Sequence, residues 1–284
     1  MSATKHRFAD ELMALGSISG HALVKVVGSG SYGVALLARE RPDQEAGLAG
    51  APGPASVIIK VAKRALAPGL DSVWAAHMQE WAALVAVVDV PGAPEAFEMG
   101  VLSLAPLDGP RPPGRGGLPV APPASGAGGA APQPHPRCHA FMTMAALGPD
   151  LWQVMSGLRA AAWKGRVFAP LAEAMLAAVS APHAAGVVHR DVKPENMCMA
   201  NAAGAGAVAE GRAGAWGAKA AVVLIDFGGA CVAGRRVRSR DRLFYGTPAY
   251  ASVASLRGAA PSPWDDLESL GYWCEEGMKG EGKR

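Results

Sequence analysis

Apolar residues recur along this chain with two different spacings. In the first half they alternate with polar residues or form short β-branched runs, which predicts strands. The predicted strands cover residues 21–27, 34–38, 57–61 and 140–144. Residues 72–88 instead carry apolar positions near a 3.6-residue period, which is typical of a helix.

Helical spacing dominates the second half. One helix is predicted over 170–180, with Pro170 in its first turn, and another over 265–275. The inward-facing positions predicted for the second helix are Leu267, Leu270, Gly271 and Cys274. The apolar run 222–225 predicts a strand. Strands that come first and helices that come later indicate an α+β fold with two lobes.

Small residues make up much of the chain and cluster in a few segments. The 284 residues include 58 Ala, 36 Gly and 23 Pro, so the hydrophobic fraction of 50% overstates the material for a core. Segments 42–54, 105–137 and 200–220 are rich in Pro, Gly or Ala and show no core pattern. We interpret them as insertions between ordered elements.

Charge and cysteine content argue against several classes of protein. A net charge of +3 is too small to indicate binding to nucleic acid or to an anionic membrane. We find neither a membrane-spanning stretch nor a secretory signal. The four cysteines form no CxxC pair, so we expect reduced thiols and an intracellular location, in the cytoplasm, the nucleus or both.

A glycine-rich segment joins the first two predicted strands. Its GxGxxG pattern consists of Gly28, Ser29, Gly30, Ser31, Tyr32 and Gly33. A strand follows it rather than a helix, which argues against a dinucleotide-binding fold and favours a hairpin whose bare backbone covers phosphate groups. A plain glycine-rich hairpin would show the same pattern.

One lysine lies among apolar residues of a predicted strand. Lys60 follows Val57, Ile58 and Ile59, and Glu80 lies in the next predicted helix. A strand lysine is usually solvated at an edge, but one that points inward needs an anionic partner, which Glu80 would provide.

The segment 189–196, with sequence HRDVKPEN, carries the most specific set of polar residues. Asp191 is placed to orient and deprotonate a hydroxyl group, and Lys193 to neutralise a phosphoryl group during transfer. Asn196 offers a hard oxygen ligand for Mg²⁺. Asp226 begins an Asp-Phe-Gly triplet after a strand and offers a second metal ligand. A turn or cap role explains each aspartate alone but not the whole set.

Together these motifs resemble a eukaryotic-type protein kinase domain. Residues 246–252 (GTPAYAS), 265–272 (DDLESLGY) and 147–151 (LGPDL) resemble more narrowly the casein kinase 1 superfamily of serine/threonine kinases. Like that superfamily, the chain lacks an Ala-Pro-Glu triplet at the end of the activation segment. The resemblance covers residues 22–277, interrupted by the three insertions.

The resemblance implies a two-lobed fold. A β-rich N-terminal lobe with the start of the hinge would occupy residues 21–146, and a mainly α-helical C-terminal lobe would occupy 147–276. Residues 277–284 would form a tail. Further helices of the family's C-terminal lobe have no counterpart here, so we expect a truncated lobe of reduced stability.

The resemblance also assigns roles to single residues. Asp191 corresponds to the catalytic base, and Lys193 to the serine/threonine form of the catalytic loop. Asn196 and Asp226 correspond to Mg²⁺ ligands, and Thr247 would hydrogen-bond near the base. The ATP-binding positions implied are Gly28, Ser29, Gly30, Ser31, Tyr32, Gly33, Ala35, Lys60, Glu80, Met144 and Leu147. The implied hydrophobic stack and its anchor are Leu84, His189, Phe227 and Asp266.

Three positions depart from the family pattern. Ile58 stands where the family usually has an alanine against adenine, and Ala249 replaces an arginine that binds phosphate near the substrate. Two interpretations stay open for the arginines of 235–242: they take over this phosphate binding, or they form a solvated basic loop. Pro182 is expected to end or kink the helix before the catalytic loop.

We therefore expect a casein kinase 1-like serine/threonine kinase that uses ATP and Mg²⁺ on protein hydroxyls. The alternative is a catalytically impaired, pseudokinase-like binding or scaffold module. A small-molecule kinase of similar fold is a third reading, against which the peptide-positioning segment 246–250 argues.

Overall fold

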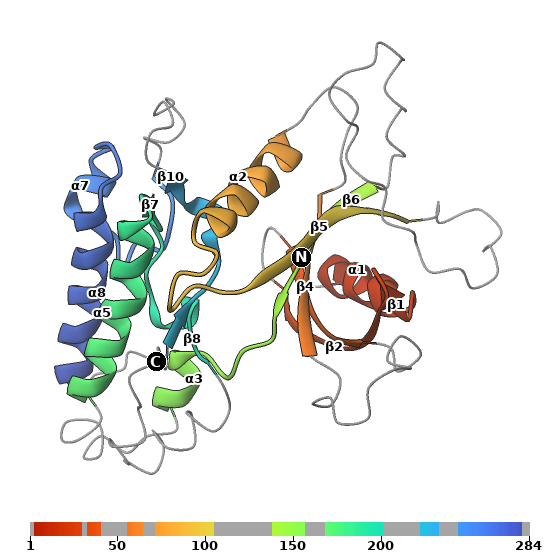
Figure 1. The fold of residues 1–284 in the computed structure, drawn as a ribbon, viewed down its shortest axis with the longest axis horizontal. Coiled ribbons are helices and arrows are strands. Elements are labelled where there is room, and N and C mark those ends of the chain that lie inside the picture. The colour runs from red at the N-terminus through yellow and green to blue at the C-terminus, as the bar shows by residue number, and fades with distance from the viewer. Residues whose placement is uncertain are drawn as a thin grey trace. The chain divides into compact units, whose positions relative to one another are not determined.

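Two compact units make up the chain in a computed structural model (Figure 1). One unit comprises Met1–Met78 and Ala96–Ala146, and the other comprises Gln79–Glu95 and Leu147–Arg284. The residues described are 3–29, 33–40, 56–64, 72–104, 138–156, 168–200, 222–232 and 244–279. Outside them lie the predicted insertions 42–54 and 105–137, the insertion 200–220 apart from its first residue, and Gly30, Ser31 and Tyr32 of the glycine-rich segment.

An antiparallel sheet of six strands forms most of the first unit. The strands are β1 (Ser17–Ile18), β2 (His21–Ser29), β3 (Gly33–Glu40), β4 (Ser56–Ala62), β5 (Ala96–Ser103) and β6 (Cys138–Ala145). They pair in the order β1-β2-β3-β4-β6-β5. The four strands predicted in this half are confirmed with slightly longer bounds, whereas β1 and β5 were not predicted.

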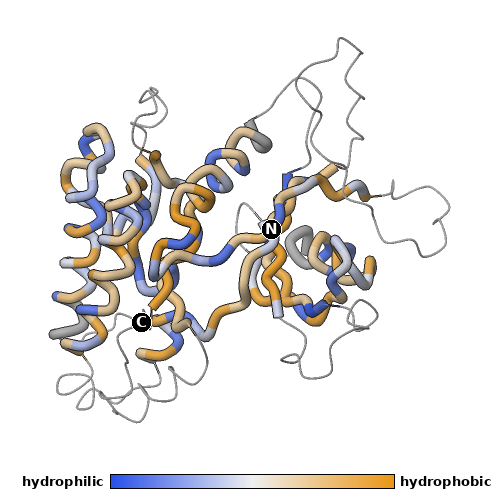
Figure 2. The backbone as a smooth tube through the Cα atoms, viewed as in Figure 1, coloured by the Kyte–Doolittle hydropathy of each residue, from blue (hydrophilic) through white to orange (hydrophobic). Residues whose placement is uncertain are grey.

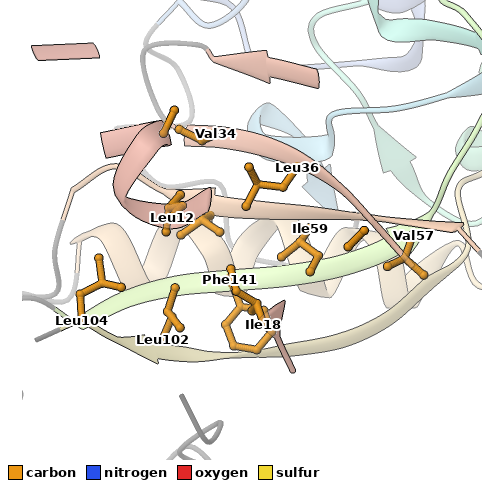
Figure 3. Close-up of a cluster of buried hydrophobic side chains, with 12 residues drawn as sticks. Leu12, Ile18, Val34, Leu36, Val57, Ile59, Leu102, Leu104 and Phe141 are labelled. Atoms are coloured by element: carbon orange, nitrogen blue, oxygen red, sulfur yellow. The ribbon is translucent and has the colours of Figure 1, made fainter. Parts of the chain in front are cut away.

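Helix α1 (Ala3–Met13) packs on one face of this sheet (Figure 3). Leu12 of the helix is fully buried against a cluster that includes Leu36, Ile59 and Phe141 from three different strands. Side chains alternate between the faces of a strand. The residues on either side of Ile59, namely Ile58 and Lys60, therefore belong to the opposite face.

The edges of the sheet are joined by a side-chain hydrogen bond. The hydroxyl of Ser19, in the turn between β1 and β2, donates to the carboxylate of Glu98 in β5. This hydrogen bond links the turn after edge strand β1 to the other edge strand, β5. Gly100 admits the close pairing of β5 with β6, since a Cβ there would lie 2.8 Å from Cε1 of Phe141.

Helices and two short ribbons build the second unit. The α-helices are α3 (Leu151–Ser156), α5 (Phe168–Ala184), α7 (Val253–Leu256) and α8 (Pro263–Lys279), and α2 (Ser72–Ala86) runs from the first unit into the second. Strand β7 (Val187–Val188) pairs with β10 (Cys231–Val232), and β8 (Met197–Met199) pairs with β9 (Val222–Leu224). Two 3-10 turns are η3 (Pro194–Asn196) and η5 (Phe227–Gly229). No helix in the described part of the chain is long and apolar enough to cross a membrane.

Helices α5 and α8 lie side by side, as Figure 1 shows. Hydrophobic residues predominate along α5, while hydrophilic and hydrophobic residues alternate along α8 (Figure 2). The rings of Phe168 and Trp273 stack with their centroids 6.3 Å apart. Leu270 and Trp273 are buried, whereas Gly271 is exposed. The prediction that Gly271 faces inward is wrong, because a helical step of three from Leu270 selects Trp273.

Helix α5 does not end at Pro182. It continues to Ala184, and the N–H of Ala185 donates to the carbonyls of Ala181 and Pro182 at 3.4 and 3.0 Å. A proline in the last turn removes one backbone hydrogen bond, and the burial of its ring offsets part of that cost. Of the two outcomes expected at Pro182, an end of the helix is wrong, and a kink stays a prediction.

Candidate active site

The β8–β9 ribbon brings two sequence-predicted metal ligands to the same end. Its register pairs Met197 with Leu224, so the next position along places Asn196 opposite Ile225. The N–H of Ile225 donates to the carbonyl of Asn196 at 2.8 Å, which extends the pairing to the residue before Asp226. All the residues of both strands are buried, which fixes this end of the ribbon.

The carboxylate of Asp191 is held by three side chains. Lys193 donates from Nζ to Oδ2 at 2.9 Å, and the Thr247 hydroxyl donates to Oδ1 at 2.9 Å. Nδ2 of Asn196 donates to Oδ2 at 3.0 Å and to the Asp191 carbonyl at 2.8 Å. Lys193 also donates to the Thr247 hydroxyl at 2.7 Å, which closes a ring of three residues. The carboxylate is thereby oriented while its side chain keeps 12% exposure.

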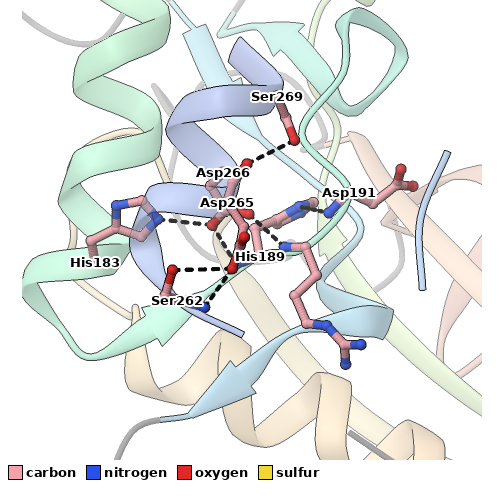
Figure 4. A network of polar contacts seen from close by, with 8 residues as sticks. His183, His189, Asp191, Ser262, Asp265, Asp266 and Ser269 are labelled. Atoms are coloured by element: carbon pink, nitrogen blue, oxygen red, sulfur yellow. Dashed lines mark hydrogen bonds and ion pairs between the residues drawn. The ribbon is translucent and has the colours of Figure 1, made fainter. Parts of the chain in front are cut away.

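The backbone that carries Asp191 is anchored by Asp266 in the first turn of α8 (Figure 4). Its Oδ2 accepts from the N–H of His189 at 2.7 Å, and its Oδ1 accepts from the N–H of Arg190 at 2.7 Å. The Nε2 atom of His183 lies 2.8 Å from Oδ2. Asp266 is fully buried, so these hydrogen bonds are shielded from competing water.

A second buried carboxylate in the same turn serves a different segment. Asp265 accepts from the hydroxyl of Ser252 at 2.5 Å and from the N–H of Ser262 at 2.7 Å. Ser252 is the N-cap of α7, so Asp265 fixes the segment that follows Thr247. Two neighbouring acids of α8 thus hold the catalytic loop and the segment after Thr247.

Asp226 occupies a left-handed backbone conformation, with φ of 65°. The ring of Phe227 is buried and meets the His189 ring edge-on, with centroids 4.9 Å apart. Nε2 of His189 lies 2.9 Å from the carbonyl of Ile225. These contacts join the turn after β9 to the catalytic loop. Leu84, the third member of the implied stack, is also buried.

The second half of α2 is tied to the same turn. Nε2 of Gln79 donates to the carbonyl of Ala230 at 2.8 Å. Glu80 is buried, and a Cβ at Gly228 would lie 3.5 Å from its Oε2 atom and 3.4 Å from Oδ1 of Asp226. Glu80 and Asp226 therefore approach Gly228 together.

Strand β8 also packs against the segment that contains Leu147. The N–H of Gly148 donates to the carbonyl of Met199 at 2.8 Å, and Asp150 accepts from the N–H of Gln153 at the start of α3. Burial, and to a smaller extent the charge of Asp150, raises the pKa of the Cys198 thiol to about 12. Cys198 is thus a protonated packing group behind the site.

Three predicted nucleotide-binding residues of the first unit, Ala35, Lys60 and Met144, share one face of its sheet. The register pairs Ala35 with Lys60 and Lys60 with Met142, and pairs Ile58 with Met144 in the next same-face row. Gly33 packs tightly on β4, where a Cβ would lie 2.8 Å from the carbonyl of Val61. Gly28 and Ser29 end β2, and Ser29 accepts from Nζ of Lys63 at 2.8 Å. The ion pair predicted between Lys60 and Glu80 would join the two units and stays a prediction.

The donor set fits the ions that phosphoryl transfer requires. Asn196 and Asp226 supply an amide and a carboxylate oxygen, which are the hard ligands that Mg²⁺ prefers. When bound, Mg²⁺ would neutralise negative charge on the phosphate groups of ATP. Their roles as ligands, like those of the other predicted site residues, remain predictions.

Two residues near the base were not singled out from the sequence as partners of this site. Arg190 has φ of 75°, and its Nη1 atom donates to the carbonyl of Gly229 at 3.4 Å. The Tyr245 ring lies beneath the Arg190 guanidinium, with 5.8 Å from Cζ to the ring centroid. Gly246, with φ of 114°, lies against the Arg190 carbonyl, where a Cβ would be only 2.5 Å away. In the sequence, the one feature that indicates these contacts is that Arg190 precedes Asp191 and Tyr245 precedes the motif 246–252.

Comparisons with known proteins match about half of the chain. No protein-family model matches it. Casein kinase 1-like protein HD16 of Oryza sativa subsp. japonica is 34% identical over 139 residues, which are 46% of this chain and 18% of that protein. Serine/threonine-protein kinase PkaB of Streptomyces coelicolor is 33% identical over 146 residues, which are 48% of this chain and 33% of that protein. About half of the chain is homologous to serine/threonine protein kinases.

This homology supports a protein kinase domain and implies a two-lobed kinase fold. It also implies, in general terms, ATP, Mg²⁺ and protein substrates. The chain spans a third or less of the length of the two curated relatives it matches. What those whole proteins do therefore enters only as support for a proposal.

Proposed function

We propose that this chain is a casein kinase 1-like serine/threonine protein kinase that transfers the γ-phosphoryl group of ATP to protein hydroxyls. The observation that carries the proposal is the carboxylate of Asp191, which Lys193, Thr247 and Asn196 hold at the end of the ribbon that precedes Asp226. A base, a cation and two hard metal ligands in one place are what phosphoryl transfer needs.

In the proposed reaction, Asp191 orients the substrate hydroxyl and accepts its proton. The hydroxyl oxygen forms the new bond to the γ-phosphorus, and the bond to the bridging oxygen breaks to release ADP. The ammonium group of Lys193, 2.9 Å from Oδ2 of Asp191, would stabilise charge on the transferring group. Thr247 keeps both of these side chains in place.

Recognition of pre-phosphorylated substrates is not part of the proposal. Ala249 is exposed and uncharged at the position where the casein kinase 1 family carries an arginine for phosphate. Unprimed serine or threonine in a protein is therefore the proposed acceptor. The intracellular location and the absence of nucleic-acid partners stay predictions.

Phosphate transfer from labelled ATP to casein tests the proposal. Asp191→Asn removes the base and is expected to lower the rate by about 10²–10⁴-fold, and Asp226→Asn is expected to raise the Mg²⁺ requirement. Glu195→Gln is the matched control, because this exposed carboxylate lies in the same loop and outside the proposed site. It is expected to retain the activity of the unmodified chain.

Equal transfer by the unmodified chain and by Asp191→Asn would overturn the kinase proposal. It would favour the scaffold alternative, for which Ile58 is the specific observation. This bulky side chain shares the Lys60 face of the sheet, between Leu37 and Met144. Titration with fluorescent ATP then separates a module that binds nucleotide from one that does not.

A further inference from the structure

The ring of Tyr245 rests on the turn that follows Asp226. A Cβ at Gly229 would lie 2.0 Å from Cε1 and 2.1 Å from Cδ1 of this ring, so the ring fills the space that any larger residue would need. The backbone of Gly229 is not left-handed. Its conformation therefore does not require glycine, whereas the position of the ring does.

The ring also contacts Arg190, the residue before the proposed base. Its guanidinium lies 5.8 Å from the ring centroid, within the range of a cation–π contact. The same guanidinium donates to the carbonyl of Gly229 at 3.4 Å. Tyr245, Arg190 and Gly229 thus form a three-membered contact between the catalytic loop and the turn.

The hydroxyl end of Tyr245 reaches the charged side of this turn. A Cβ at Gly228 would lie 3.3 Å from the Tyr245 hydroxyl, 3.4 Å from Oδ1 of Asp226 and 3.5 Å from Oε2 of Glu80. Three polar groups from three elements therefore surround the same glycine. The Tyr245 hydroxyl and the Asp226 carboxylate therefore border the same space at Gly228.

The two residues after Tyr245 engage the base itself. Gly246 lies against the carbonyl of Arg190, and Thr247 donates to the carboxylate of Asp191. Residues 245–247 thus contact the metal-binding turn at one end and the base at the other. Residues 245–247 therefore set the distance between the turn 226–229 and Asp191.

We propose that Tyr245 is a positioning residue, which holds the turn 226–229 at a fixed distance from Asp191 through Gly229 and Arg190. In this role it acts through the position of Asp226 and not directly on substrate or metal. The effect on catalysis rests on the proposed kinase function, while the effect on the turn does not. Gly229 is required for this contact, because its missing side chain leaves room for the Tyr245 ring.

A double-mutant cycle tests this device. Tyr245→Ala removes the ring and is expected to lower kcat about tenfold, which is the effect of a small misplacement of a ligand. It is also expected to raise the Mg²⁺ concentration at half-maximal rate, since Asp226 loses its support. Gly229→Ala should cause at least the same loss through the clash. The double variant should be no worse than Tyr245→Ala, because removing the ring makes room for the methyl group.

Two further variants separate the ring from general packing. Tyr245→Phe keeps the ring and is expected to retain most of kcat. Phe244→Ala removes the neighbouring aromatic side chain, which is 40% exposed, and is expected to leave kcat and the Mg²⁺ dependence unchanged. If Tyr245→Ala does not fold, Tyr245→Leu replaces it, because leucine fills space but offers no flat face to Arg190 and should shift the Mg²⁺ dependence in the same direction.

Hydrogen exchange of residues 226–232 gives a readout that needs no activity. Exchange there is expected to be faster in Tyr245→Ala than in Tyr245→Phe or Phe244→Ala. If the unmodified chain is no more active than Asp191→Asn, the kinase proposal fails, and the exchange result still decides whether Tyr245 holds the turn. Unchanged exchange and unchanged Mg²⁺ dependence in Tyr245→Ala would overturn the inference, and so would fully additive losses in the double variant.

Discussion

Asp266→Asn is the substitution that most directly tests how the catalytic loop is held. The buried carboxylate accepts backbone N–H groups on both oxygens, from His189 and Arg190, each at 2.7 Å. Asparagine has the same shape but only one acceptor oxygen. Whichever way its amide is turned, the NH₂ group faces one of the two backbone N–H groups. One donor of the loop therefore loses its partner.

The cost follows from the charge and burial of this group. A hydrogen bond to a charged acceptor contributes about 1.5–3 kcal/mol, and a buried donor left without a partner costs about 1–3 kcal/mol. These two contributions overlap, so we expect a loss of about 3 kcal/mol in the free energy of unfolding. For a domain of this size that corresponds to a fall in Tm of about 6–12 °C.

Urea unfolding followed by tryptophan fluorescence measures this loss, and the kinase assay measures its functional part. Because Asp266 lies away from the reacting groups, kcat should fall together with order in the loop while KM for ATP changes little. Glu195→Gln again provides the control carboxylate. A loss below about 0.5 kcal/mol, the scale of an ordinary surface substitution, would refute the idea that Asp266 anchors the loop.

Three further outcomes are expected. Thr247→Val removes the hydroxyl that bridges Lys193 and Asp191, so kcat should fall about tenfold with little change in Tm; an unchanged kcat would contradict the bridge. Cys198, whose pKa is raised from 9.0 to about 12, should resist alkylation below pH 9 until the chain unfolds. Because its folded pKa is the higher one, its contribution to stability should be lost as pH rises from 9 towards 12, and the difference from Cys198→Ala should show this. Leu12→Ala should destabilise the first unit by about 3–5 kcal/mol in urea unfolding, since the side chain is fully buried; a loss below about 1 kcal/mol would mean that α1 is not a structural part of the core.

The sequence predicted best where the signal is local. Asp191, Lys193 and Asn196 lie within one short motif, and the apolar strand 222–225 led directly to Asp226. Side-chain hydrogen bonds hold Asp191, Lys193 and Asn196 together, while the register of β8 and β9 places Asn196 opposite Ile225, the residue before Asp226. The roles of these residues remain predictions, and the structure places Lys193 and Asn196 within hydrogen-bonding distance of Asp191 in the second unit.

Elements that depend on distant packing were missed. Helix α1 has Phe8, Ala9 and Leu12 at helical spacing, but charged residues surround them in the sequence. Their packing role becomes visible only from the sheet face that they cover. Strand β5 contains Gly100, and a glycine in the sequence suggests a loop. In the structure, the Phe141 ring occupies the space of the missing side chain.

The contact of Tyr245 with Gly229 has the same character. The residues are 16 positions apart in the chain, and neither belongs to a motif that defines the other. Its cause is steric, since one ring fills the space of one absent methyl group. Spacing rules describe neighbours on one helix or strand and therefore cannot predict a contact such as that of Tyr245 with Gly229.

The pairing of β5 with β6 has a consequence for engineering. These strands match almost residue for residue from Ser103 and Cys138 up to Ala96 and Met144, although residues 104–137 connect them. Doubling the length of a connection costs only about 0.6 kcal/mol in chain entropy. The connection between Leu104, which is buried in the core, and Cys138 should therefore accept a foreign domain, such as a fluorescent reporter, while the sheet keeps its register.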